Sequence, residues 1–270
     1  MSSESMVRRV AIVISMIALQ ACSDAFEFSP NQEFSKNSIR DMNAKNIARL
    51  AKNTKDTITI AFIGDSQRFY NDVEKFVNKA NTIEEIDFVL LAGDISDFGL
   101  LNEFNWVTDR LTKLKMPYIG VVGNHDVVAN GENVFQRMFG PLNQSFIYDS
   151  VKFILHNTNS REYVGNNVPD LEWLEQELSE QPGVKYQIAV SHVPPFADGD
   201  FNPALEQDYS KLFAETPNFL ISLHGHIHNH KDYYPYKDGV RYITSPSFDQ
   251  RSFVLLKIAN GNVVKTLINY

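Results

Sequence analysis

The sequence of 270 residues predicts an α/β fold in which two sheets are covered by helices, and three observations support this prediction. Apolar runs of strand length alternate with amphipathic stretches of helix length, which indicates parallel strands joined by crossovers. Short polar segments that contain glycine directly follow the first three apolar runs, as is typical of the carboxyl ends of strands in an open sheet. Several short strand-like runs then close the chain.

Residues 1–21 are predicted to be a signal peptide. Two arginines precede the uncharged run 10–19, which is too short to cross a bilayer as a helix. The run ends in Leu19-Gln20-Ala21-Cys22, which resembles the lipobox of bacterial lipoproteins and would make Cys22 an acylated first mature residue. The alternative is a plain secretory signal with an incidental cysteine. We therefore expect an exported protein, held by a lipid at the periplasmic face or the cell surface if the lipobox is used.

Residues 22–56 are predicted to form a polar tether and an N-terminal helix, because apolar residues recur at near-helical spacing between positions 39 and 50. A single domain of α/β size is expected over 57–270. The formal net charge is −8, and no basic cluster follows the signal segment, so we expect no long nucleic acid as a partner. Nothing in the sequence predicts the oligomeric state.

The first half of this domain is predicted to alternate strands and helices. Strands buried on both faces are expected at 57–63, 86–92 and 118–122, where the residues are almost continuously aliphatic. Helices are expected at 72–80 and 101–114, the second with apolar residues along one side. This order implies that the three strands pair in parallel.

The second half is predicted to begin with a hairpin of 145–149 and 152–156 around Ser150-Val151. Pro169 is expected in the first turn of a helix over 170–180. Further strands are expected at 186–191 and 218–223. A closing antiparallel meander is predicted over 241–244, 253–258 and 263–267, with Asn260-Gly261 as a hairpin turn.

Seven polar residues lie at predicted strand ends in an order that would suit phosphoester cleavage: Asp65, Asp94, Asn124, His125, His192, His226 and His228. Phosphoryl transfer requires neutralised phosphate oxygens and an in-line nucleophile, and two divalent metals about 3.5–4 Å apart provide both. Mixed carboxylate, amide and imidazole ligands suit Mn, Fe or Zn better than Mg or Ca. Each residue alone is a weak signal, whereas their joint order is a strong one.

Together these motifs resemble those of the calcineurin-like metallophosphoesterase superfamily over residues 57–245. The resemblance implies a four-layer α/β/β/α sandwich of two mixed sheets flanked by helices. It also implies an enzyme that hydrolyses a small-molecule phosphomonoester or phosphodiester through a metal-bridging hydroxide at a dinuclear site.

The same resemblance implies roles for individual residues. Metal one would be held by Asp65, Asp94 and His228. Metal two would be held by Asp94, Asn124, His192 and His226, with Asp94 as the bridge. His125 would donate a proton to the leaving oxygen, and Asp97 would orient His125 and stabilise its charge.

Gln67 departs from the family pattern, because the usual first motif is Asp-any-His and its histidine ligates metal one. One interpretation is that metal one is lost, which would leave a noncatalytic protein that binds a single metal. The other is that the Gln67 oxygen ligates metal one and favours Mn over Zn or Fe. We favour ligation, because His125 and Asp97 are retained. The manganese-dependent ADP-ribose and CDP-alcohol pyrophosphatases are similar in carrying Asp-any-Gln, so a nucleotide-diphosphate pyrophosphatase is the alternative activity.

Residues that contact the substrate are the least specified part of the sequence. Three arginines are candidates for binding phosphate oxygens: Arg68, Arg161 and Arg251. Three aromatic residues could stack on a base or sugar, although loop packing is the simpler expectation: Tyr163, Phe196 and Phe201. Four further residues are expected to support the site or the core: Asp126, His156, His224 and His230.

Overall fold

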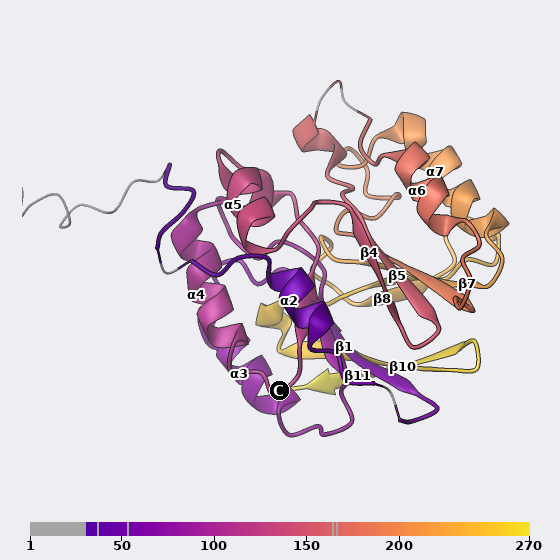
Figure 1. The fold of residues 1–270 in the computed structure, drawn as a ribbon. Coiled ribbons are helices and arrows are strands. Elements are labelled where there is room, and N and C mark those ends of the chain that lie inside the picture. The colour runs from indigo at the N-terminus through magenta and orange to yellow at the C-terminus, as the bar shows by residue number, and fades with distance from the viewer. Residues whose placement is uncertain (1–30, 37, 53, 164, 166) are drawn as a thin grey trace, which may run out of the picture. The chain divides into compact units, whose positions relative to one another are not determined.

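The structure is a computed structural model that describes residues 31–36, 38–52, 54–163, 165 and 167–270. The predicted signal peptide and Cys22 lie outside these residues. The compact unit Glu33–Tyr270 contains two mixed sheets with helices on their outer faces (Figure 1). Within the described ranges, no helix has both the length and the apolar character needed to cross a membrane.

The first sheet has the strand order β11-β10-β1-β2-β3. Its parallel strands are β1 (Ile58–Ile63), β2 (Phe88–Leu91) and β3 (Tyr118–Gly120), as predicted. The crossovers between them are α3 (Tyr70–Ala80) and α4 (Leu101–Leu111). The antiparallel hairpin of β10 (Ser252–Ala259) and β11 (Asn262–Asn269) extends the sheet beside β1.

The second sheet has the strand order β4-β5-β6-β7-β9-β8. Its four inner strands are parallel: β5 (Val151–Leu155), β6 (Tyr186–Val190), β7 (Phe219–His224) and β9 (Tyr242–Thr244). Its edges are the antiparallel strands β4 (Gln144–Tyr148) and β8 (Lys231–Tyr233). Helices α6 (Leu171–Leu178) and α7 (Pro203–Glu215) follow β5 and β6.

Three apolar clusters separate the layers. The middle cluster joins the facing sheets through residues such as Phe62 and Phe153. A second cluster packs the first sheet against α3, α4 and α5 (Gly131–Met138), and a third packs the second sheet against α6 and α7. Figure 1 shows these two helix groups on opposite outer faces. The four-layer α/β/β/α prediction is therefore confirmed.

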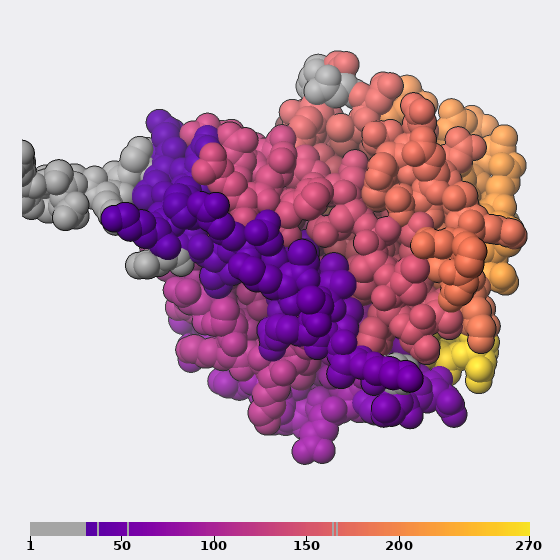
Figure 2. Space-filling model, viewed as in Figure 1, coloured from indigo at the N-terminus to yellow at the C-terminus, as the bar shows by residue number. Residues whose placement is uncertain are grey.

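The predicted N-terminal helix forms as α2 (Met42–Ala48) and covers the edge strand β3. Asn43 Nδ2 donates to the Gly120 carbonyl at 2.8 Å, and the Gly120 N–H donates back to Asn43 Oδ1 at 2.9 Å. Asn46 Nδ2 donates to the Tyr118 carbonyl at 2.7 Å. These amides satisfy edge groups that would otherwise be open to another strand. Figure 2 shows the indigo segment running across the surface of the later, magenta part of the chain.

The predicted closing meander is wrong in one strand. β9 lies in the second sheet, parallel to β7 and antiparallel to β8. Of the three predicted meander strands, only β10 and β11 pair with each other, and their turn is Asn260-Gly261, whose φ angles of 50° and 78° are both positive, as a type I′ turn requires. The apolar pattern of β9 identifies a buried strand but carries no information about its partner.

The turn of the first hairpin and the start of α6 differ from prediction by one or two residues. The first hairpin turns at Asp149-Ser150, because Tyr148 pairs with Val151. Pro169 precedes α6 instead of lying in its first turn. Asp170 is the N-cap, and its side chain accepts the Trp173 N–H at 3.0 Å. The capping hydrogen bond therefore sets where this helix begins.

Candidate metal centre

The candidate ligands follow the carboxyl ends of strands in both sheets. Asp65 follows β1, Asp94 follows β2, and Asn124 lies beyond β3. In the second sheet, His192 lies beyond β6, and His226 and His228 follow β7. Because each set of strands is parallel, their carboxyl ends meet at one edge.

The loops that carry these residues have unusual backbone conformations. Five candidate ligands have left-handed φ angles between 35° and 68°: Asp65, Gln67, Asp94, His226 and His228. Such conformations are costly for non-glycine residues and cluster at functional sites. The first two loops are joined by backbone hydrogen bonds, from the Asp65 N–H to the Gly93 carbonyl and from the Gln67 N–H to the Asp94 carbonyl, both at 3.0 Å.

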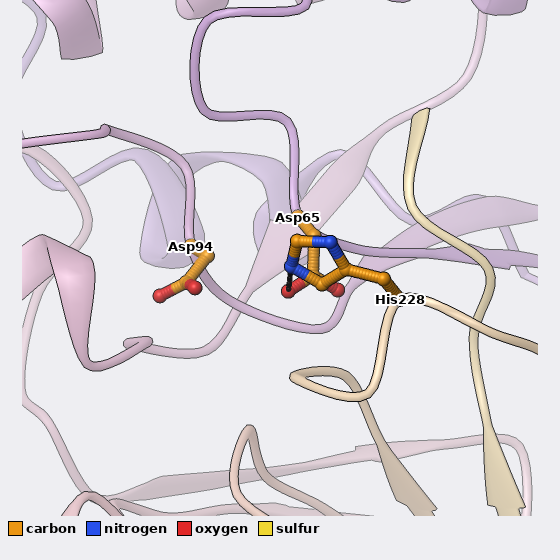
Figure 3. Close-up of side chains that lie close together, drawn as sticks. All are labelled: Asp65, Asp94 and His228. Atoms are coloured by element: carbon orange, nitrogen blue, oxygen red, sulfur yellow. Dashed lines mark ion pairs between the residues drawn. The ribbon is translucent and has the colours of Figure 1, made fainter. Parts of the chain in front are cut away.

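The first ligand cluster contains Asp65, Asp94 and His228, whose ligand atoms all lie within 4.8 Å of one another (Figure 3). His228 Nε2 lies 3.3 Å from Asp65 Oδ1, and this contact raises the pKa of His228. Asp65 Oδ2 is buried and accepts no hydrogen bond within the described residues. A carboxylate oxygen can only accept, so leaving it buried without a donor is costly unless a cation binds there. This cluster therefore fits a divalent metal.

Gln67 ends beside the shared carboxylate. Its side chain is buried, and Nε2 lies 3.4 Å from Asp94 Oδ2. Rotating the amide by half a turn would bring Oε1 to the same place, since its oxygen and nitrogen have nearly the same shape. The structure thus places the carboxamide beside Asp94, and its role as a ligand remains a prediction.

The second cluster is centred on Asn124 Oδ1. This oxygen lies 3.1 Å from His192 Nε2 and 3.1 Å from His226 Nδ1. His192 Nε2 also lies 3.2 Å from Asp94 Oδ2. The four residues that sequence reasoning assigned to metal two are therefore brought together, with Asp94 shared between the two clusters.

In each histidine ring of the second cluster, the outer nitrogen, which faces away from Asn124, is a hydrogen-bond donor. His192 Nδ1 lies 2.6 Å from the Ala92 carbonyl, and His226 Nε2 lies 3.0 Å from Asp200 Oδ2. Both partners can only accept, so both outer nitrogens carry hydrogen. A neutral ring then directs a lone pair from its inner nitrogen toward Asn124 Oδ1. A divalent metal between these atoms would accept the lone pairs of both rings and of the amide oxygen.

In the absence of a metal, a proton can supply this charge. Burial opposes ionisation of both Asp94 and His192, but their mutual attraction is stronger. It lowers the pKa of Asp94 to about 2 and raises the pKa of His192 to about 10. A metal that binds at this position would displace the proton from His192.

His125 lies between the clusters and the loop that carries Asp97. Its backbone N–H donates to Asp94 Oδ1 at 2.9 Å. Its Nδ1 lies 2.7 Å from the Asp97 carbonyl but 3.8 Å from the Asp97 carboxylate. The main chain of Asp97 therefore orients the ring, and its carboxylate is the more distant charge. Nε2 of His125 makes no hydrogen bond within the described part of the chain, which leaves it available to a ligand.

Two of the three candidate arginines lie beside this centre. Arg68 contacts Asp97 at 3.3 Å, and Arg161, in the 3₁₀ helix η2 (Ser160–Tyr163), contacts Asp200 at 2.9 Å. Both side chains are more than 60% exposed. Arg251 instead pairs with Asp72 on α3 at 3.1 Å. The structure thus places Arg68 and Arg161 beside the centre and joins Arg251 to a helix.

The candidate aromatic residues mostly belong to the core. Phe196 and Phe201 pack in the cluster between the second sheet and its helices. The Tyr163 hydroxyl donates to Glu132 on α5 at 2.6 Å. Loop packing therefore accounts for the contacts of all three.

Three further histidines are held by hydrogen bonds away from the clusters. His224 lies between Ser191 and Ser222, at 3.0 and 2.8 Å. His156 Nε2 lies 2.8 Å from the Tyr209 hydroxyl. His230 Nδ1 lies 3.0 Å from the Thr244 carbonyl.

Asp126 joins the loops that follow β2 and β3. Its carboxylate accepts the N–H of Ser96 at 2.8 Å and that of Gly123 at 2.9 Å. Burial, together with the charge of Asp94, raises the pKa of Asp126 to about 7. Gly123 is required where it stands, because a Cβ there would lie 2.1 Å from the Asp94 nitrogen. This packing holds the loop after β3 against the shared carboxylate.

Sequence reasoning missed Asp200. It lies in the loop between β6 and α7, outside any recognisable motif. Its only sequence signal is a carboxylate a few residues beyond the His192 segment. The fold brings it to His226, which is distant in sequence.

Comparison with known proteins identifies the family. The chain is 28% identical over 214 residues to a 3′,5′-cyclic-nucleotide phosphodiesterase of Nostoc sp., covering 72% of this chain and 80% of the relative. Two solved structures share the fold at 14% identity. A purple acid phosphatase from yellow lupin matches 81% of this chain and 52% of its own, with a TM-score of 0.61. A dimetal phosphatase from Danio rerio matches 79% and 99%, with a TM-score of 0.56. The family model for calcineurin-like phosphoesterases matches residues 58–230, so the chain belongs to this family and is a phosphoric ester hydrolase.

Proposed function

We propose that the protein hydrolyses a small-molecule phosphodiester at a dinuclear metal centre. The observation that carries this proposal is the pair of ligand clusters that share Asp94. A diester is favoured over a monoester because the relative from Nostoc, which matches most of this chain, is named a phosphodiesterase.

The chain's own residues would divide the work between binding and proton transfer. Asp65 and His228 would hold one metal. Asn124, His192 and His226 would hold the other, and Asp94 would contribute to both sites. When bound, the two cations neutralise the phosphate oxygens and activate the attacking water.

His125 would protonate the leaving oxygen through Nε2, because Nδ1 is committed to the Asp97 carbonyl. Arg68 and Arg161 would contact the non-bridging phosphate oxygens when they turn from their carboxylate partners. Arg251 remains a substrate candidate only if its pair with Asp72 opens.

We propose Mn as the preferred metal, with Fe and Zn as the other candidates. A Gln67 oxygen in place of an imidazole would make the first site harder, which favours Mn. Metal analysis after purification from medium that contains all three ions would test this preference. Retention of zinc alone would contradict it.

A nucleotide-diphosphate pyrophosphatase is the second candidate function, and the position of Gln67 beside Asp94 is the observation that favours it. An ADP-ribose and CDP-choline panel, run beside a cyclic nucleotide, would separate the two. Preferential release of a nucleoside monophosphate from the diphosphates would replace the diesterase proposal.

The activity itself is tested with the manganese-loaded protein and a bis-aryl phosphate. Asp94→Asn should abolish cleavage, because it weakens both clusters at once. Asp198→Asn makes the same change at an exposed position and serves as the matched control. Activity that survives Asp94→Asn would remove the assignment of this centre.

We also propose that the protein is exported and anchored through an acylated Cys22. The support is the sequence Leu19-Gln20-Ala21-Cys22 alone. Labelled palmitate should enter the wild-type protein in a bacterial host but not the Cys22→Ser variant. Absence of label from the wild-type protein would favour the plain secretory signal.

A further inference from the structure

Asp200 joins a candidate metal ligand to a candidate substrate residue. It lies in the loop between β6 and α7, and each of its carboxylate oxygens has a different partner. Oδ2 lies 3.0 Å from His226 Nε2, and Oδ1 lies 2.9 Å from Arg161 Nη1. Both partners donate to Asp200, since a carboxylate only accepts.

We propose that Asp200 is a positioning residue that sets the tautomer of His226 for metal binding. By holding hydrogen on Nε2, Asp200 leaves the Nδ1 lone pair directed at the second cluster, 3.1 Å from Asn124 Oδ1. This inference rests on the proposed metal centre, but it concerns a residue outside the ligand set.

The tautomer of His226 depends on the Asp200 side chain, whereas the tautomer of His192 depends on no side chain. His192 is fully buried, and its outer nitrogen is fixed by a main-chain carbonyl that no substitution removes. The side chain of His226 is 19% exposed, and Asp200 is the partner of its outer nitrogen. Without this carboxylate, water could bond either tautomer of His226. Loss of such a partner typically weakens metal binding about 10- to 100-fold.

The shared carboxylate makes an isosteric test possible. In Asp200→Asn, one end of the side chain can still accept, but the other can only donate. Arg161 can only donate, so it should attract the new amide oxygen and turn the amide nitrogen toward His226. The amide N–H can only donate, so it would need an unprotonated His226 Nε2 as its acceptor. The ring hydrogen would then sit on Nδ1, the nitrogen that should bind the metal.

The experiment measures zinc affinity by competition with a chromophoric chelator, because zinc is diamagnetic and permits NMR of the same samples. Wild-type protein should bind two equivalents. Asp200→Asn should weaken one site by about 10- to 100-fold and leave the other unchanged. Arg161→Met alone should leave zinc affinity unchanged. Added to Asp200→Asn, it should restore at least part of the affinity, because the amide can then turn its oxygen to His226.

A second readout reports the tautomer directly. Long-range proton–nitrogen correlation spectra of histidine-labelled protein should show His226 with hydrogen on Nε2 in the wild type and on Nδ1 in metal-free Asp200→Asn. Asp198→Asn, two residues earlier and exposed, should match the wild type in both readouts.

Three outcomes separate the possibilities. If wild-type protein fails to bind two zinc ions, the dinuclear proposal itself fails. If it binds two, and Asp200→Asn also binds both with unchanged affinity, the role of Asp200 is wrong. If Asp200→Asn weakens binding but Arg161→Met does not restore it and the tautomer is unchanged, Asp200 acts through packing, and the proposal is overturned.

Discussion

The two ligand clusters share Asp94 but differ in how firmly their other members are held. In the second cluster, both rings have a fixed outer nitrogen, and His192 is fully buried. In the first cluster, the His228 side chain is 39% exposed, and its Nδ1 makes no hydrogen bond within the described residues. A preorganised site loses less entropy on binding, so we expect the second cluster to bind its metal more tightly.

The difference lies in the histidines, because the carboxylates of both clusters follow buried inner strands. His192 and the chain leading to His226 rest on β6 and β7, inner strands of the second sheet that are covered by α7. In the first cluster, Asp65 and Asp94 are as buried as His192, but His228 is partly exposed, and Asp65 Oδ2 has no donor among the described residues. The protein therefore fixes both rings of the second cluster, whereas a bound ion would fix the His228 ring of the first.

The largest expected effect comes from removing the residue that the clusters share. Asp94→Asn deletes a charge at both sites, and metal ions contribute several kcal/mol of transition-state stabilisation, with about 1.4 kcal/mol for each tenfold change in rate. We expect kcat/KM to fall by about 10⁴-fold or more and both metals to be lost together. Stoichiometry by elemental analysis checks the second point. Retention of two metals would show that the clusters are not joined through this carboxylate.

His125→Ala should separate chemistry from metal binding. General acid catalysis contributes about 10²- to 10⁴-fold, so kcat should fall by this amount. Both metals should remain, because only the His125 main chain contacts Asp94. The effect should be smaller for a substrate with a nitrophenolate leaving group, which needs little protonation. Metal loss equal to that of Asp94→Asn would contradict this role.

His156, which follows β5 in the second sheet, should also make the free energy of unfolding depend on pH. Burial lowers the pKa of His156 to about 4, below the value of about 6.5 expected in the unfolded chain. The unfolded state therefore binds a proton first as the pH falls. The stabilisation is complete above about pH 6.5 and is lost toward pH 4, a change on the order of 3 kcal/mol.

Urea unfolding of the metal-free protein at pH 7.5 and pH 5 measures this loss, with His156→Gln as the comparison. Glutamine keeps a hydrogen-bonding group for Tyr209 but does not titrate in this range. The difference in unfolding free energy between the two proteins should therefore shrink as the pH falls. Parallel curves would mean that His156 is protonated equally in both states.

Much of the site could be predicted because its ligands stand in short segments directly after strong apolar runs. The order of Asp65, Asp94 and Asn124 reflects three parallel strands, and local sequence contains that pattern. Asp200 could not be found in this way, because only the path from β6 through α7 to β7 brings it to His226. The tautomer of His226 therefore depends on a contact between loops that leaves no trace in the spacing of the ligands.

The fold shows the same limit. Composition identifies the buried strands, but it predicts the wrong neighbours for β9 because pairing is decided by the whole sheet. Helix α7 was missed although a local signal existed. Asn202 caps it by accepting the Ala204 N–H at 3.0 Å, and Pro203 occupies its first turn. Its amphipathic pattern is weak, because only Tyr209, Ser210 and Phe213 of the helix are buried.

The smallest effect should come from strengthening the weaker cluster. Gln67→His would replace a carboxamide beside Asp94 with an imidazole, a better ligand for Zn and Fe. We expect zinc affinity at the first site to rise by about tenfold, a gain of about 1.4 kcal/mol, while the second site stays unchanged. Calorimetric titration of zinc should then show two binding steps that lie closer together than in the wild type. If the tighter step strengthens instead, Gln67 acts on the second cluster. If neither step moves, Gln67 does not reach a metal, and the first cluster is completed by Asp65, Asp94 and His228 alone.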